Sequence, residues 1–414
     1  MLTRLIAAIF LAATPLATRA AVAQGRTDLL ARGEYLTRAA DCEACHTAPG
    51  GHPFAGGRPF VLPFGTIYSP NITPDQATGI ADYSDADWLG ALHQGKGRDG
   101  KHLYPAMPYA SYTRMSDEDA LAIKAYLMSL APVSAKTPDG TVRFPFNIRW
   151  LMVFWNFFNN SDRRFEPDGS KSAEYNRGAY LVQALGHCGE CHTPRNITMG
   201  LSSSRTLAGA EIEGWQAYNL TSDPVHGLGT WTDEQLAQYL STGQAAGRGP
   251  ASGPMAEAVE DSLRYLTRED IRAMVVYLRD VPPQADGPPV GQPGSPAVKL
   301  DPLGVRLFAQ ACAGCHLPDG GGRQVPWAAL EGSHTVSDPD GTNLVQVLKQ
   351  GTRLTTAEGE VFMHPFTGAY TDRELAALSN YVVGQFGFRE GRIAPTRFPR
   401  SQASDMDAAR RPAF

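Results

Sequence analysis

The stretch Cys188-Gly189-Glu190-Cys191-His192 decides how the rest of this chain is interpreted. The same pattern of two cysteines, two residues apart and followed at once by a histidine, stands at 42–46 and at 312–316. Cys-x-x-Cys-His is the attachment pattern of c-type haem. The two thiols form thioether bonds with the porphyrin, and the imidazole becomes the proximal ligand of the iron. Three copies of the pattern predict three covalently bound haem c groups.

The predicted binding residues follow directly from the three motifs. The thioether cysteines are Cys42, Cys45, Cys188, Cys191, Cys312 and Cys315, and the proximal iron ligands are His46, His192 and His316. These are all six cysteines of the chain, so none remains for a disulfide. Zinc sites, iron–sulfur sites and thioredoxin-like sites also use Cys-x-x-Cys pairs, but none of them explains a histidine directly after each pair.

Length and composition indicate an ordinary globular protein. The chain has 414 residues, which suits two to four domains, and 43% of them are hydrophobic. The net charge is −5, so the composition gives no reason to expect a nucleic-acid partner.

The first 23 residues are predicted to be a signal peptide. Arg4 supplies the positive start, Leu5 to Leu16 form a short apolar core, and Ala21-Val22-Ala23 resembles a cleavage site. Export suits the cofactor, because c-type haem is attached outside the cytoplasm. We therefore expect the protein in the periplasm, a location compatible with peripheral attachment to the outer face of the bacterial inner membrane.

The three motifs lie in three copies of one unit, and the predicted fold is all-α, with three tandem cytochrome c domains joined by irregular linkers. The fold follows from the haem signature, since helical periodicity alone is common to many all-α folds. The predicted segments are a signal peptide (1–23), a first cytochrome c domain (24–140), an aromatic-rich linker (141–172), a second domain (173–283), a Pro/Gly linker (284–297), a third domain (298–387) and a polar C-terminal tail (388–414).

Each copy shows the same three helix signals. The first helix has a glycine near its start, which should permit close approach of another helix. The middle helix ends in a glycine, expected in the left-handed conformation. The last helix opens with a hydroxyl residue followed by an acid three positions on. In chain order these residues are Gly33, Gly178 and Gly304; Gly95, Gly243 and Gly351; and Ser116, Thr267 and Thr371.

Counting from the glycine that ends each middle helix selects a second iron ligand. Met107, Met255 and Met363 each stand at the same distance after that glycine, and each has a proline within two residues. A His/Met ligand pair is typical of electron-carrying haem and raises its reduction potential. The three methionines are therefore predicted as sixth ligands. In the third copy the neighbouring His364 is a competing candidate.

Two further stretches have no assigned role in haem ligation. Residues 150–158 are strongly aromatic, and they either pack onto the neighbouring haem domain or form a surface for a dehydrogenase subunit or a membrane. Asn71-Ile72-Thr73 and Asn219-Leu220-Thr221 lie at similar distances after His46 and His192. They match the sequon for glycosylation but are better explained as a repeated loop beside the haem.

The sequence resembles the triple-haem cytochrome c subunits of bacterial dehydrogenase complexes that oxidise alcohols, gluconate, sorbitol or fructose outside the cytoplasm. The resemblance is carried by residues 64–75, 103–109, 176–181 and 186–196. It implies an electron-transfer subunit, with the catalytic site on a partner dehydrogenase that holds a flavin, pyrroloquinoline quinone or molybdenum cofactor. Electrons would leave to ubiquinone or a terminal oxidase. No catalytic residue is predicted in this chain.

A haem enzyme, such as a peroxidase or a nitrite reductase, is the alternative. Such an enzyme needs one iron with an open coordination position and acid or base groups beside it. Three apparent methionine ligands argue against an open position, and the third haem is where the two interpretations differ most.

Overall fold

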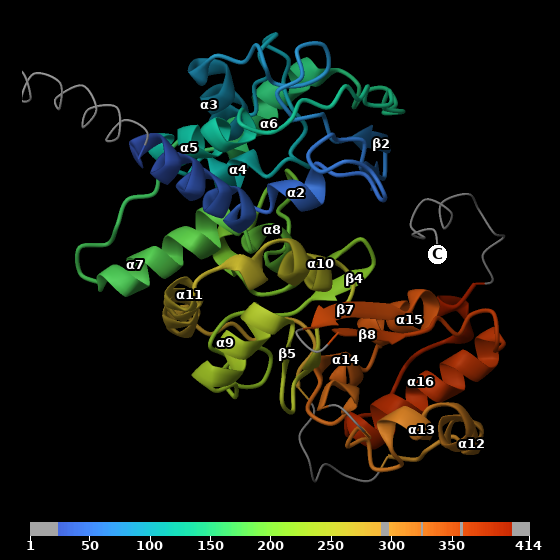
Figure 1. Cartoon of the computed structure of the whole chain (residues 1–414). Coiled ribbons are helices and arrows are strands. Elements are labelled where there is room, and N and C mark those ends of the chain that lie inside the picture. Colours follow the sequence, from blue (N-terminus) through green and yellow to red (C-terminus); the bar gives the residue numbers. More distant parts are fainter. Residues whose placement is uncertain (1–23, 291–297, 324–325, 357–358, 400–414) are drawn as a thin grey trace, which may run out of the picture. The chain divides into compact units, whose positions relative to one another are not determined.

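The computed structural model describes residues 24–290, 298–323, 326–356 and 359–399. The predicted signal peptide lies outside the described residues. The described chain is mostly helical, with a few two-stranded antiparallel sheets between the helices (Figure 1).

The chain divides into two compact units. One consists of Met1–Tyr109 with Met115–Met152, and the other of Ala110–Arg114 with Val153–Phe414. The first sequence copy therefore makes up most of the first unit, while the second and third copies share the second unit. Because three separate domains remain a prediction, the copies are called the first, second and third repeats.

The first repeat begins with a helix over residues 24–39 and holds one hairpin. Its strands pair in register from Pro59↔Tyr68 to Leu62↔Gly65. The elements up to the start of the aromatic-rich stretch are α2 (Cys42–Cys45), β1 (Pro59–Leu62), β2 (Gly65–Tyr68), α3 (Asp85–Gln94), α4 (Tyr109–Tyr112), α5 (Asp117–Leu127) and η1 (Arg149–Leu151).

In the second repeat, the helices α7 (Ala173–Tyr180) and α11 (Arg268–Asp280) pack together. The elements from the aromatic-rich stretch onwards are α6 (Met152–Asn159), α7 (Ala173–Tyr180), the π-helical turn η2 (Leu181–Leu185), α8 (Gly189–His192), η3 (Ser203–Arg205), β3 (Ala210–Ile212), β4 (Trp215–Ala217), α9 (Asp233–Thr242), β5 (Gln244–Ala245), β6 (Gly249–Pro250), α10 (Pro254–Asp261), η4 (Leu263–Tyr265) and α11 (Arg268–Asp280).

The third repeat builds its core around the long helix α16. Its elements are α12 (Pro302–Ala311), α13 (Ala313–His316), η5 (Pro326–Ala328), α14 (His334–Ser337), α15 (Thr342–Gln350), β7 (Thr352–Thr356), β8 (Gly359–Met363), α16 (Asp372–Phe386) and η6 (Pro395–Arg397). The buried face of α16 packs against α12, with Phe308 and Tyr381 in ring contact at 5.2 Å.

The predicted close approach of the first and last helices is confirmed in all three repeats. A Cβ atom at Gly178 would lie 1.8 Å from the carbonyl oxygen of Ala273 on α11. The equivalent distance is 2.1 Å from Gly33 to Ala122 and 2.3 Å from Gly304 to Ala377. Only a residue without a Cβ lets the two backbones cross this closely.

The predicted helix starts are confirmed, and the predicted helix ends are confirmed in two cases of three. The hydroxyl groups of Ser116, Thr267 and Thr371 each accept a hydrogen bond from the backbone N–H three residues later. Gly95 and Gly243 cap α3 and α9 in the left-handed conformation. Gly351 has φ 75° but ψ −175°, so the expectation of a left-handed cap is wrong there. The chain leaves α15 directly into β7, which requires an extended ψ.

Four of the five aromatic rings of residues 150–158 are exposed and Trp155 is half-buried, so the core-packing interpretation is wrong for most of them. Trp150, Phe154, Phe157 and Phe158 are 61%, 53%, 82% and 68% exposed. The spacing of three and four residues from Phe154 to Phe157 and Phe158 places these three side chains on one face of α6. These three residues form the exposed aromatic face.

The part of the predicted polar tail that the structure describes is packed rather than free. Ile393 and Phe398 are buried within the core of the third repeat. The Asn380 side chain on α16 holds the backbone of Ile393 through two hydrogen bonds of 2.9 Å. Residues 388–399 therefore belong to the third repeat, beyond the boundary that the sequence suggested. In the described part of the chain, no helix combines the length and apolar character needed to span a membrane.

Candidate haem-binding sites

Each Cys-x-x-Cys-His motif forms one short helical turn. The turns are α2, α8 and α13, and each is closed by a bond from the backbone N–H of the histidine to the carbonyl of the first cysteine. The N···O distances are 3.0 Å for His46, 2.9 Å for His192 and 2.9 Å for His316. A helical turn places residues four apart on the same side, so thiol and imidazole can face one porphyrin.

The three proximal histidines share a second feature. Nδ1 of His46 lies 2.8 Å from the carbonyl oxygen of Pro70, Nδ1 of His192 lies 2.6 Å from that of Tyr218, and Nδ1 of His316 lies 2.7 Å from that of Ala328. A carbonyl can only accept, so Nδ1 carries the hydrogen in each ring. The Nε2 lone pair is then available to a metal, and the hydrogen bond increases its basicity.

Burial keeps these imidazoles neutral. It lowers the pKa of His46, His192 and His316 below the ordinary value, and the accepting carbonyl opposes the shift in each case. A neutral imidazole with a fixed tautomer is the form that binds iron. The donor set of each motif therefore fits a c-type haem.

The thiols differ from those of a redox-active Cys-x-x-Cys pair. Burial raises the pKa of Cys188 to about 12 and that of Cys312 to about 11, and it raises the pKa of Cys42 further still. Thioredoxin-like sites lower the pKa of the attacking thiol instead. The thioredoxin-like interpretation is therefore disfavoured on the structure as well as on the sequence.

The repeated Asn-x-Thr stretches hold two of the accepting carbonyls in place. Asn219, directly after Tyr218, is 2% exposed, and its Oδ1 accepts from the N–H and the hydroxyl of Thr221 at 2.8 and 2.7 Å. Its Nδ2 donates to the carbonyl of Gln284 at 2.7 Å. Asn71 makes the same pair of bonds with Thr73 and is equally buried. A repeated loop is confirmed, and burial of both asparagines makes these sequons inaccessible.

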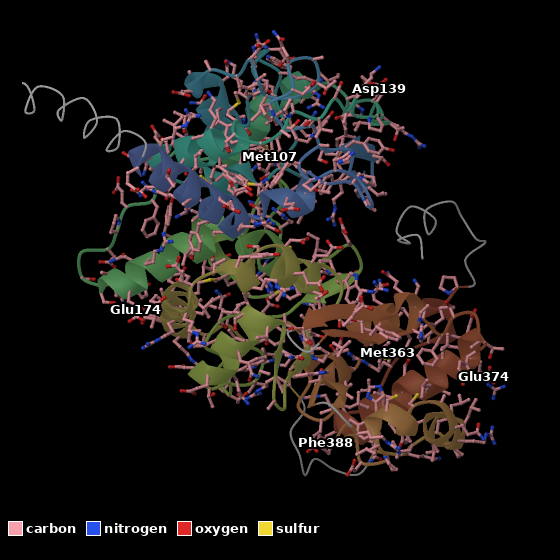
Figure 2. The ribbon with its side chains drawn as sticks, in the orientation of Figure 1. Met107, Asp139, Glu174, Met363, Glu374 and Phe388 are labelled. Atoms are coloured by element: carbon pink, nitrogen blue, oxygen red, sulfur yellow. The ribbon has the colours of Figure 1, made fainter. Side chains whose placement is uncertain are left out.

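The predicted methionine ligands stand on three different kinds of backbone. Met107 lies in a loop, with its N–H bonded to the carbonyl of Tyr104 at 3.1 Å. Met255 is the second residue of α10, and Met363 ends β8, where it is paired with Thr352. Figure 2 labels Met107 and Met363. All three side chains are half-buried. The three methionines stand at the same distance after a helix-ending glycine, but each lies in a different local structure. The sequence did not indicate this difference.

In the third repeat, the two candidate iron ligands differ in burial. Met363 packs against the core cluster of the repeat, whereas His364 is exposed and its ring meets Phe362 edge-on at 4.9 Å.

The second motif has polar partners that the sequence did not reveal. Glu190, between its two cysteines, accepts from the Ser111 hydroxyl at 2.7 Å and pairs with Arg195 at 3.0 Å. Arg195 also donates to the backbone carbonyl of Glu190 at 2.9 Å. The charge of a half-buried carboxylate at the motif is thus compensated by a guanidinium.

The accepting carbonyls are a further part of the sites that sequence reasoning missed. Pro70 and Tyr218 each precede the asparagine of a repeated loop, so a signal for them existed. Ala328 follows His316 at a much shorter distance, without an asparagine, and no sequence signal marks it.

Comparison with known proteins agrees with this chemistry. The cytochrome c family matches residues 30–131, and the family of cytochrome c oxidase, cbb3-type, subunit III matches residues 301–382. The chain is 39% identical to the fructose dehydrogenase cytochrome subunit of Gluconobacter japonicus, over 88% of this chain and 81% of the relative. It is 38% identical to the gluconate 2-dehydrogenase cytochrome c subunit of Pantoea cypripedii, over 88% and 87%.

A third relative extends the range of substrates. The cytochrome c subunit of the quinone alcohol dehydrogenase of Gluconobacter oxydans is 35% identical, over 86% of this chain and 78% of the relative. The three relatives are named for fructose, gluconate and alcohol, so what they share is the kind of subunit and not the substrate.

Proposed function

The chain belongs to the family of cytochrome c subunits of dehydrogenase complexes, and we propose that it transfers electrons by means of three haem c groups. Such a group supplies one-electron redox chemistry when bound. The chain's part is to attach it, ligate it and keep water away. The proposed proximal and distal ligand pairs are His46 with Met107, His192 with Met255, and His316 with Met363.

One observation carries this proposal. All three motifs form the same helical turn, and all three histidines donate from Nδ1 to a backbone carbonyl over 2.6 to 2.8 Å. A motif that bound no metal would have no need to fix the histidine tautomer. His316 of the third motif also donates to a carbonyl, although the loop that supplies it is shorter than in the first two repeats. The shared hydrogen bond supports a haem at the third motif as well.

We propose that the electron donor is a separate dehydrogenase subunit acting on a CH–OH group, and that ubiquinone or a terminal oxidase is the acceptor. The names of the relatives support a donor of this class. The periplasm is the proposed location, because the predicted leader and the site of c-type haem attachment agree on export.

The haem number can be tested on the protein isolated from its native membrane. We expect an intact mass that exceeds the mature chain by three haems, and loss of one haem when Cys312 and Cys315 are both changed to serine. An excess of two haems in the unaltered protein would refute the third site. Mass spectrometry of the copurified subunits should identify a dehydrogenase; rapid CO binding to one haem would instead favour a haem enzyme.

The exposed aromatic face is proposed to lie against a membrane. Between Asp139 and Asp162 the chain has no acidic residue, and the exposed Arg163 follows the face within the same compact unit, although the whole chain carries a net charge of −5. Aromatic rings beside an arginine suit the headgroup region of an anionic bilayer, where the rings are buried and the guanidinium group meets phosphate.

Vesicle flotation tests this surface. With vesicles containing anionic lipid, we expect the holoprotein to float and a Phe154→Ser, Phe157→Ser, Phe158→Ser variant to stay in solution. The matched control is Val305→Ser, which removes another exposed apolar side chain from helix α12. If the triple variant floats normally but no longer copurifies with the dehydrogenase, the face binds that subunit and not lipid.

A further inference from the structure

Within the second compact unit, the second and third repeats are joined by a side-chain clamp. Asn343 on α15 accepts from the backbone N–H of Gln216 at 2.7 Å and donates to its carbonyl at 3.0 Å. Gln346, one turn later, donates to the carbonyl of Gly214 at 2.9 Å. These bonds occupy the free edge of β4 as a neighbouring strand would, so β4 lies fixed beside α15 (Figure 1).

A second set of bonds joins the elements that carry the proposed methionine ligands. The Thr355 N–H on β7 donates to the carboxylate of Glu260 on α10, and the hydroxyls of Thr352 and Ser252 lie 3.2 Å apart. Met255 belongs to α10, and Met363 is paired with Thr352 across the hairpin. The two repeats therefore meet at defined positions close to both sites.

A buried aromatic contact lies in the same interface. His334, at the start of α14, is 8% exposed, and its ring meets the ring of Tyr218 edge-on, with centroids 4.9 Å apart and an angle of 72°. The ring centroids of Trp231 and His334 are 6.4 Å apart. Tyr218 and Trp231 come from the second repeat, so the His334 ring is a third-repeat side chain held among second-repeat rings.

Tyr218 connects this contact to the second motif. Its carbonyl oxygen is the acceptor for Nδ1 of His192. The backbone around it is held upstream by Asn343 through Gln216 and downstream by the buried Asn219. The ring of Tyr218 packs edge-on against His334, and its hydroxyl interacts with Thr335 and Asn343, so third-repeat residues hold this side chain. Hydrogen bonding to the far nitrogen of a metal-bound imidazole is a known way of adjusting the metal.

We propose that His334 is a positioning residue for the second haem site, acting across the repeats through Tyr218. The proposal rests on the proposed function, since it requires haem at the second motif. Loss of the His334 ring removes the ring contact that holds Tyr218, shifts Tyr218 and weakens the hydrogen bond from His192. The imidazole then becomes a poorer electron donor, so the reduction potential of that haem rises.

Redox titration of the holoprotein, followed by absorption spectroscopy, tests the proposal. The variants are His334→Ala and His334→Phe. Since Nε2 of His334 has no hydrogen-bond partner among the described residues, the phenyl ring keeps the aromatic contact without removing an observed bond at that atom. We expect one of the three potentials to rise in the alanine variant and to return towards its original value in the phenylalanine variant.

A marked haem identifies which potential moves. Met255→His lowers the potential of the second haem by replacing its distal ligand. Adding His334→Ala to this background should raise the marked component and leave the other two unchanged. His226→Ala is the matched control, because His226 lies in the second repeat and its side chain pairs with Asp223. It should change no potential.

Three results would overturn the proposal. One is an unchanged set of potentials in His334→Ala with normal haem content and melting temperature. Another is a shift confined to a component other than the marked one. The third is a change in all three potentials that His334→Phe does not reverse, which would show a general loss of folding. An intact mass lacking haem at the second motif would refute the proposed function itself, so the two failures are distinguishable.

Discussion

Nδ1 of His192 lies 2.6 Å from the carbonyl oxygen of Tyr218, and the residue after Tyr218 is the asparagine that ties this loop to Gln284, the first residue after the repeat. His192, the carbonyl of Tyr218 and the side chain of Asn219 are therefore connected by hydrogen bonds and the backbone. The same connection exists at His46, where Pro70 accepts and Asn71 donates to the carbonyl of Val133 at 2.7 Å. Disturbing the anchor should disturb the site.

Asn219→Ala is expected to destabilise the second repeat by about 2–3 kcal/mol, because it leaves buried groups without partners. Thermal unfolding followed by circular dichroism measures the loss. Asn196→Ala is the matched control: Asn196 makes the same bonds to Thr198 at 2.9 and 2.7 Å, but it is exposed. Equal losses in the two variants would mean that burial of Asn219 has no role.

Gly178→Ala should destabilise the second repeat by about 1–3 kcal/mol, because the new methyl group forces α7 away from the backbone of α11. The midpoint of urea unfolding reports the change. Gly169→Ala adds the same methyl group where nothing lies within 4 Å, so its midpoint should stay close to that of the unaltered protein. A stable Gly178→Ala protein would contradict the observed helix crossing.

Met255→Leu should remove the methionine-to-iron charge-transfer band of one haem, which reduces that near-infrared band by about one third if all three haems have His/Met ligands. Near-infrared absorption of the oxidised protein makes the measurement. Met274→Leu is the control, since Met274 is a 1% exposed core residue of α11. An unchanged band in Met255→Leu would remove this residue from the ligand set.

In the third repeat, Met363→Leu should have the same spectral effect and His364→Ala should have none. The physical reason is the burial of Met363 against the core, compared with the exposed position of His364. Low-temperature EPR separates the outcomes, because His/His and His/Met haems give different signals. A new methionine band in His364→Ala would identify His364 as the natural ligand.

The stability of the protein should depend on pH through His334. Burial, with the nearby Arg248 guanidinium as a second cause, lowers its pKa to about 4 from the ordinary 6.5. Between these values the unfolded chain binds a proton that the folded chain does not, so folding becomes less favourable as the pH falls from 6.5 to 4. The loss amounts to about 3 kcal/mol.

His334→Phe removes this titration and supplies the comparison. The difference in unfolding free energy between the unaltered protein and the variant should be constant above pH 7 and should shift in favour of the variant towards pH 4. Urea unfolding at a series of pH values measures it. A constant difference over the whole range would show that His334 has the same pKa in both states.

The sequence was most informative where a feature depends on neighbouring residues. The helical turn of each motif and the hydroxyl caps at Ser116, Thr267 and Thr371 arise from residue type and short spacing. Gly351 shows the limit, because its glycine ends a helix as expected, but the strand that follows sets a different backbone angle.

The exposed aromatic face shows a second limit. Eight of the residues 150–158 are apolar, but composition alone does not show whether their side chains are buried. Periodicity alone does not distinguish an apolar helix face that meets a core from one that meets solvent, since both have the same spacing. Whether a helix face is buried depends on the residues that the fold places against it. The structure shows that four of the aromatic rings in this stretch are exposed.

The chain's own residue order determined the haem chemistry, because thioether formation and proximal ligation need only Cys-x-x-Cys-His on one helical turn. It also determined the candidate distal ligands, through their constant distance from a helix end. Only the tertiary structure decided which carbonyls fix the histidine tautomers, and that His334 of the third repeat lies against Tyr218 of the second. Those contacts join residues far apart in the chain, and their partners are selected by packing, which no local pattern encodes.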